Sequence, residues 1–164
     1  MSTKQNTHHD IEKFLKVVEE SWSSETSADP ENWDENNRAW GQCAVTAAMV
    51  QNEFGGEIVR VMYQTPEKNA SSHYFNILSD CTRVDGTLKQ FPKGTVFFPS
   101  LDENNEVLKE TTQQYLHEKG FEDAGAYILS GESTARRYQI LQNRASVLRS
   151  EPPQSRHNDH TLER

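Results

Sequence analysis

Apolar residues recur at intervals of three and four over much of the chain, a spacing that predicts helices. Residues 9–22 are predicted to form an amphipathic helix, with apolar side chains at Ile11, Phe14, Leu15, Val18 and Trp22. Residues 41–54 are apolar on nearly every side, which predicts a largely buried helix, and Gly55-Gly56 predicts that it ends in a left-handed cap. Two more helices are predicted over residues 106–119 and 132–149.

Between the two pairs of helices the sequence changes to the pattern of β-strands. Residues 57–65 are rich in β-branched side chains without clean alternation, which predicts a strand covered on both faces. Residues 73–79 and 82–87 predict two strands joined by a short turn, and residues 94–100 predict either a fourth strand or a packed loop. We therefore expect an α+β fold in which a central buried helix packs on an antiparallel sheet, with flanking helices.

The length and composition limit how much of the chain belongs to that fold. The chain has 164 residues, which suits one domain, but only 34% are apolar and the mean hydropathy is -0.87. We expect residues 1–8 to be a flexible N-terminus, residues 9–149 a single α+β domain, and residues 150–164 a disordered polar tail.

The charge and the absence of long apolar runs exclude several classes of partner. The formal net charge is -8, which argues against nucleic acid and against an anionic membrane, because both recruit clustered Lys and Arg. No apolar run approaches the ~20 residues of a membrane span, and the N-terminus has no apolar signal core. We predict a cytoplasmic protein whose partner is a small-molecule, peptide or protein substrate. The sequence does not indicate an oligomeric state.

Cys43 stands where a helix N-terminus would favour its thiolate. The predicted buried helix begins next to Gly41, and the partial positive charge of a helix N-terminus stabilises a nearby anion. Gly41 lets a substrate or another chain segment approach the backbone closely. The amide of Cys43 and the side chain of Gln42 are then candidate donors to an oxyanion.

His73 is the histidine that falls at the start of an apolar strand. Folding residues 73–79 back on 82–87, with the turn centred near Ser79, places His73 opposite Asp85 on one face of the hairpin. An aspartate in that position fixes the imidazole tautomer and stabilises the imidazolium. Asn76 is an alternative orienting residue, although it lies on the opposite face of the strand.

The chain order Cys43, His73, Asp85 resembles that of papain-like enzymes in the broad sense, including transglutaminases and arylamine N-acetyltransferases. Residues 33–148 also closely resemble the YunG-like family of small, largely uncharacterised bacterial proteins. The matching positions are Gly41, Gln42, Cys43, Thr46, His73, Tyr74, Asn76, Val84, Asp85 and Thr87. One departure is Gly86, where that family usually has Leu, and we expect this glycine to loosen the strand. The resemblance implies a fold more than a reaction.

Together these residues predict a cysteine-dependent hydrolase or acyltransferase with catalytic Cys43, His73 and Asp85 and with no metal or cofactor. A non-catalytic binding or assembly protein with the same fold and a dormant site is the alternative. An inert buried Cys43, a zinc site that adds Cys81, and a Cys43–Cys81 disulfide or redox pair are further possibilities.

Overall fold

The computed structural model describes residues 8–151, so the predicted flexible N-terminus and polar tail lie almost wholly outside the described residues. The helices are α1 His8–Ser21, α2 Cys43–Phe54, α3 Asn105–Lys119, α4 Ala124–Ser130 and α5 Glu132–Ser150. The strands are β1 Glu57–Gln64, β2 Ala70–Ile77, β3 Arg83–Val84 and β4 Val96–Phe98. Three 3-10 turns are η1 Ser24–Thr26, η2 Glu35–Asn37 and η3 Leu88–Gln90.

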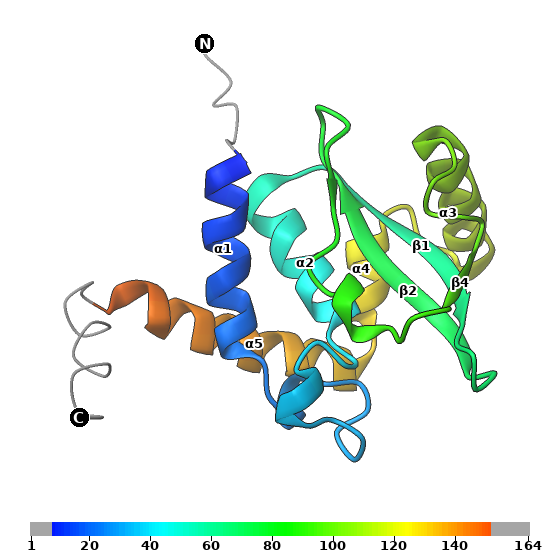
Figure 1. The fold of residues 1–164 in the computed structure, drawn as a ribbon. Helices are drawn as coiled ribbons and strands as arrows, with labels where there is room; N and C mark the ends of the chain where they lie inside the picture. The colour runs from blue at the N-terminus through cyan, green and yellow to red at the C-terminus, as the bar shows by residue number, and fades with distance from the viewer. Residues whose placement is uncertain (1–7, 152–164) are drawn as a thin grey trace, which may run out of the picture.

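The predicted α+β class is confirmed, and most predicted elements are found close to their predicted bounds (Figure 1). The predicted strand over residues 82–87 is much shorter, since β3 has two residues. Helix α4 was not predicted at all. Gly55 does end α2, with a φ of 74°, but its ψ of −152° lies outside the left-handed helical region expected of the cap. Within residues 8–151 no helix is both long and apolar enough to cross a membrane.

The sheet is antiparallel with the strand order β3-β2-β1-β4. Only the central hairpin is long: β1 and β2 pair over their whole length, from Glu57 with Ile77 to Gln64 with Ala70. The outer strands each cover one part of it. β3 pairs with β2 only at residues 76–77, and β4 pairs with β1 only at residues 62–64. Each outer edge of the hairpin is therefore left without a strand over more than half of its length.

Helices fill the edges that the short outer strands leave open. Thr112 of α3 accepts a hydrogen bond from the backbone N–H of Arg60, at 2.9 Å, so α3 lies along the open part of β1. Helix α2 packs against β2, where the Asn76 side chain donates to the carbonyl of Ala47 at 2.9 Å. Helices α1 and α5 lie beyond α2 and bury their apolar sides against it (Figure 1). The predicted buried helix thus lies between the sheet and two other helices.

The backbone that leads into α2 is held by two other segments. Gly41 has a φ of +73°, its carbonyl accepts from the N–H of Ala28 at 2.9 Å, and its N–H donates to Gln90 Oε1 at 3.2 Å. A Cβ at Gly41 would overlap Ser27 Oγ and lie 2.9 Å from the Ala28 nitrogen. Both the left-handed backbone and the close packing require glycine here. The start of α2 is consequently fixed by tertiary contacts.

We expect Gly41→Ala to lower the free energy of unfolding by about 2–4 kcal/mol, because it adds left-handed strain to an overlap with backbone atoms. Gly120→Ala is the matched control: this residue is left-handed, with a φ of +82°, but nothing lies within 4 Å of an added Cβ. That variant carries the strain alone, about 1–2 kcal/mol. Urea denaturation of both variants measures the difference, and equal losses would contradict the packing role of Gly41.

Candidate active site

The structure brings Cys43, His73 and Asp85 together. His73 Nε2 and Asp85 Oδ2 lie 2.7 Å apart, and the two side chains are 0% and 7% exposed. Cys43 is the first residue of α2, is half-buried, and lies close enough to His73 for the imidazole to lower the pKa of its thiol. The three residues that sequence pattern selected from separate segments therefore form one cluster.

His73 and Asp85 meet although the predicted register of their hairpin is wrong. Asn76 pairs with Val84, so the turn is centred on Asp80 and the register, if continued, would place Asp85 across from Phe75. Phe75 and His73 lie on the same face of β2, so the carboxylate still reaches the imidazole diagonally. When the centre of the turn moves by one residue, the residue paired with Asp85 changes by two positions, from His73 to Phe75. Because side chains alternate along a strand, a change of two positions keeps them on the same face.

The chain has left the sheet before it reaches Asp85 and Gly86. A Cβ at Gly86 would lie 2.9 Å from Cδ2 of Leu15, so the glycine lies close against α1. Gly86 lies beyond β3, which ends at Val84, so the expected loosening of a strand at this glycine stays a prediction. The glycine allows the segment after Asp85 to pack closely on α1.

The open edge of β2 explains how a thiol on α2 reaches His73. The N–H of Leu78 donates to Thr82, so the even-numbered residues of β2 direct their backbone groups toward β3. At Tyr74, β3 has already ended, and the backbone N–H interacts with Cys43 instead. The sulfur thus lies at the strand edge, between the face that α2 covers and the face that carries His73.

The ring nitrogens of His73 have different partners. Asp85 holds Nε2, so Nδ1 is the nitrogen left for the sulfur of Cys43. Nδ1 has no well-aligned hydrogen bond among the described residues, so its contact with the thiol is loose. Loose catalytic hydrogen bonds are common in resting enzymes and tighten when substrate binds.

The charges in this cluster favour an ion pair between thiolate and imidazolium. Burial by itself raises the pKa of Cys43, but the hydrogen bond and charge of His73 and the N–H of Tyr74 outweigh it, and the pKa is lowered. Burial likewise lowers the pKa of His73, but hydrogen bonds to Asp85 and Cys43 raise it to about 9. Both shifts favour transfer of the thiol proton to the imidazole.

The two predicted supporting residues occupy different places. The Gln42 side chain is fully buried; its Nε2 donates to the carbonyl of Ser23 at 3.0 Å, and its Oε1 has no partner among the described residues. Its amide nitrogen is thus engaged by the backbone at Ser23. Asn76 is bonded to Ala47, so it ties α2 to β2 and does not take the place of Asp85.

Aromatic rings that the sequence did not point to enclose His73. The ring of Phe91 meets the imidazole edge-to-face at 4.9 Å between centroids, and Phe97 lies at 6.1 Å. Tyr63 packs on Phe91 at 4.6 Å. Burial, and after it the negative charge of Cys43, raises the pKa of Tyr63, which places this ring near the thiol as well. These rings keep water from the imidazole.

A cation on α5 also lies near the thiol. Arg137 donates to the carbonyl of Thr26 at 3.4 Å and to Thr134 Oγ1 at 3.0 Å, and its Nε is buried without a partner among the described residues. Burial lowers the pKa of Arg137, and the charge of Cys43 partly offsets that effect. The position of Arg137 within a predicted amphipathic helix gave no local signal of this contact.

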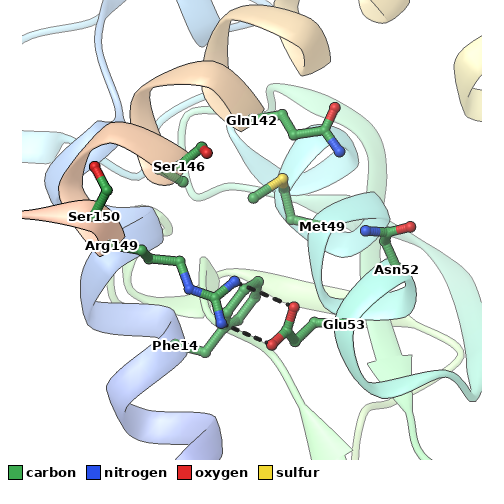
Figure 2. Close-up of a pocket in the computed structure, with 9 residues that line it drawn as sticks. Phe14, Met49, Asn52, Glu53, Gln142, Ser146, Arg149 and Ser150 are labelled. Atoms are coloured by element: carbon green, nitrogen blue, oxygen red, sulfur yellow. Dashed lines mark hydrogen bonds and ion pairs between the residues drawn. The ribbon is translucent and has the colours of Figure 1, made fainter.

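Two cavities of similar size lie at opposite ends of α2. One, of about 450 Å³, adjoins the cluster, because its walls include Trp40 and Phe91. The other, of about 460 Å³, lies between α2 and α5, where Arg149 pairs with Glu53 at 2.9 Å beside Phe14 (Figure 2). Its opposite charges neutralise each other, and neither Phe91 nor Phe97, the rings that enclose His73, lines it. The smaller cavity is therefore the candidate substrate cleft.

The metal and redox alternatives find no support among residues 8–151. That part of the chain has no group of three or more His, Cys, Asp or Glu side chains arranged to hold a metal ion. Cys43 and Cys81 are both free thiols; Cys81 is exposed in the turn between β2 and β3. The structure therefore contains no Cys43–Cys81 disulfide.

Comparison with known proteins gives a family but no reaction. The family model described as YunG protein matches residues 10–120, a range that includes Cys43, His73 and Asp85. An uncharacterised protein YunG of Bacillus subtilis (strain 168) is 28% identical over 108 residues, which cover 65% of this chain and 86% of that protein. No solved structure is significantly similar.

We expect Cys43 to react with iodoacetamide with an apparent pKa below the ~8.5 of an ordinary thiol. His73→Ala is expected to move this pKa above the ordinary value, since burial then acts without the imidazolium. Alkylation rates between about pH 5 and 10, read by mass spectrometry of the peptide that contains Cys43, measure the shift. The exposed Cys81 is the internal control. A pKa that does not change in His73→Ala would show that the two groups are not coupled.

Proposed function

The chain belongs to the YunG family, and from this premise and the geometry above we propose that it is a cysteine-dependent hydrolase or acyltransferase that acts on an amide or acyl substrate. The observation that carries the proposal is the contact between a thiol at a helix N-terminus and an imidazole whose other nitrogen is held by a buried carboxylate. A cysteine on a central helix, with histidine and aspartate on neighbouring strand segments, is the arrangement of papain-like and transglutaminase-like enzymes. We therefore also propose that the chain has the papain-like fold type.

The proposed reaction has two steps: the acyl group is first transferred to the sulfur of Cys43 and is then released from it. The Cys43 thiolate attacks the substrate carbonyl carbon, and the carbon–nitrogen bond breaks as His73 gives its proton to the leaving amine. A thioester remains on Cys43. Water or an amine then attacks this thioester while His73 takes the proton from the attacking group, and the carbon–sulfur bond breaks to restore the thiolate. Asp85 holds the ring by Nε2 and stabilises its positive charge throughout.

Backbone amides of α2 are the nearest donors for the oxyanion. The first N–H groups of a helix have no partner within it, and the Gln42 side chain makes no capping hydrogen bond at this end. The N–H of Cys43 is therefore the first donor that we assign to the developing negative charge. The Gln42 side chain is assigned to holding the segment before α2, because its nitrogen is bonded to Ser23.

The non-catalytic alternative predicts a different arrangement. A dormant site would tolerate a thiol remote from the imidazole and a closed surface beside it. The imidazole of His73 instead lowers the pKa of the thiol, which is half-buried, and a cavity of about 450 Å³ is lined by Phe91, the ring that packs on His73. These observations favour the catalytic proposal. A reducing cytoplasm fits it too, because Cys43 acts as a free thiol, and we propose that compartment.

We expect incubation with 4-nitrophenyl acetate to place an acetyl group on Cys43 and to release 4-nitrophenol in a burst. Intact-mass measurement and peptide mapping locate the adduct. His73→Ala is expected to slow acylation by about 10²–10⁴-fold, the usual effect of losing a general acid–base group. Asp85→Asn is expected to slow it less, since the imidazole remains.

Cys43→Ala removes the proposed nucleophile, and Cys81→Ser is the matched control that removes the other thiol. The first variant is expected to lose the burst and the second to keep it. Acetylation at other residues only, or an equal burst in Cys43→Ala, would count against acyl transfer through Cys43. Circular dichroism and thermal unfolding show whether each variant remains folded.

A further inference from the structure

The cavity beside the catalytic cluster has a chemical character of its own. Its walls come from the segment before α2, from the turn between β1 and β2, and from the segment around η3. It adjoins the cluster, although Cys43, His73 and Asp85 do not line it. Trp40 precedes Cys43 by three residues, and Phe91 contacts the ring of His73 at 4.9 Å. The cavity thus shares one wall, the ring of Phe91, with the surroundings of His73.

One carboxylate in this cavity has no counter-charge. Glu67, in the turn between β1 and β2, is exposed and forms no ion pair or hydrogen bond with any residue in the described range 8–151. Lys89 also lines the cavity, but it pairs with Glu19 and lies over the ring of Trp22, at 5.6 Å. The charge left over in the cavity is therefore negative.

The other walls suit a positive group. The indole of Trp40 is half-buried and is held by a 3.0 Å hydrogen bond from its Nε1 to Asp29, so the ring is fixed at the cavity wall. Aromatic faces attract ammonium and guanidinium groups, by about 0.5–2 kcal/mol. The amide side chains of Asn36 and Asn69 add neutral hydrogen-bonding groups. The net charge of -8 adds a general attraction for cations.

We propose that this cavity binds a positively charged side chain of the substrate, an alkylammonium or guanidinium group such as that of lysine or arginine, with Glu67 as its carboxylate partner and Trp40 as its aromatic wall. The proposal rests on the proposed function, since it assigns the substrate class of the same site. The enzyme then acts on an acyl or amide group carried by a basic peptide or amine, and it discriminates against anionic substrates. A neutral carbohydrate is the main competing occupant for a cavity of tryptophan and amide groups.

The test compares three cysteine probes on Cys81→Ser protein, which leaves Cys43 as the single thiol. They are iodoacetamide, N-(4-aminobutyl)iodoacetamide and 4-(iodoacetamido)butanoate, so charge is the main variable between the last two. Rates are divided by those of N-acetylcysteine methylamide to remove intrinsic reactivity. We expect the cationic probe to react about 5-fold or more faster than the anionic probe, in line with the attraction of a cation to an aromatic and acidic site.

Glu67→Gln is expected to remove most of this preference, and Glu110→Gln is the matched control. Glu110 is an exposed acid on α3, and no residue of α3 lines the cavity, so the control removes the same charge elsewhere. Raising the ionic strength from about 0.05 to 0.5 M is expected to weaken the preference. No preference for the cation, or a preference that survives in Glu67→Gln, overturns the assignment of the cavity.

The proposed function fails in a different way from the cavity assignment. If neutral iodoacetamide reacts with Cys43 no faster than with the reference thiol, the catalytic proposal is lost. The cavity is then tested without chemistry, in Cys43→Ala protein, by NMR shifts of the Trp40 indole N–H. N-acetyl-lysine methylamide is expected to shift that signal, and N-acetyl-glutamate methylamide is not. Shifts with N-acetylglucosamine but not with the lysine derivative would assign the cavity to carbohydrate and overturn the proposal.

Discussion

The bond between His73 and Asp85 is the interaction on which the candidate site depends. An imidazolium that is wholly removed from water is strongly unfavourable unless a carboxylate compensates it, and removing one partner of such a buried pair costs about 3–5 kcal/mol. Asp85 meets this need at 2.7 Å, and the rings of Phe91 and Phe97 close the surroundings. The same burial strengthens the attraction between the imidazolium and the Cys43 thiolate. The buried pair of His73 and Asp85 thus supports both the local fold and the proposed chemistry of Cys43.

The shortness of β3 is what allows that pair to face a nucleophile. A third strand as long as β2 would have occupied the backbone N–H of Tyr74 and kept α2 away from the strand edge. Because β3 ends at Val84, the chain turns away from the sheet at Asp85, and the N-terminus of α2 takes the vacant edge. The carboxylate, the imidazole and the thiol meet where the sheet stops. The site is thus a consequence of an incomplete sheet.

The position of the thiol is set by contacts remote from it in sequence. Gly41 connects the start of α2 to the loop at Ala28 and to Gln90 beyond β3, and no side chain other than hydrogen fits there. Asn76 then fastens the first turns of α2 to β2 through Ala47. The segments that hold the helix start also form the walls of the adjacent cavity. Small displacements of these segments would therefore alter the site and its cleft together.

The sequence by itself determined the features that depend on local spacing. The helical and strand periods gave α1, α2, β1, α3 and α5, and the position of Cys43 at a helix start followed from them. The meeting of His73 and Asp85 was also predicted from the alternation along strands, which a turn displaced by one residue leaves intact as far as Val84, where β3 ends. The tertiary structure alone decided the true turn centre at Asp80, the length of β3 and the existence of α4. It also placed Phe91 against His73, Arg137 within electrostatic reach of Cys43, and Glu67 in the wall of the adjoining cavity. These features depend on packing between segments distant in the chain, and local residue patterns carry no record of which distant surfaces will meet.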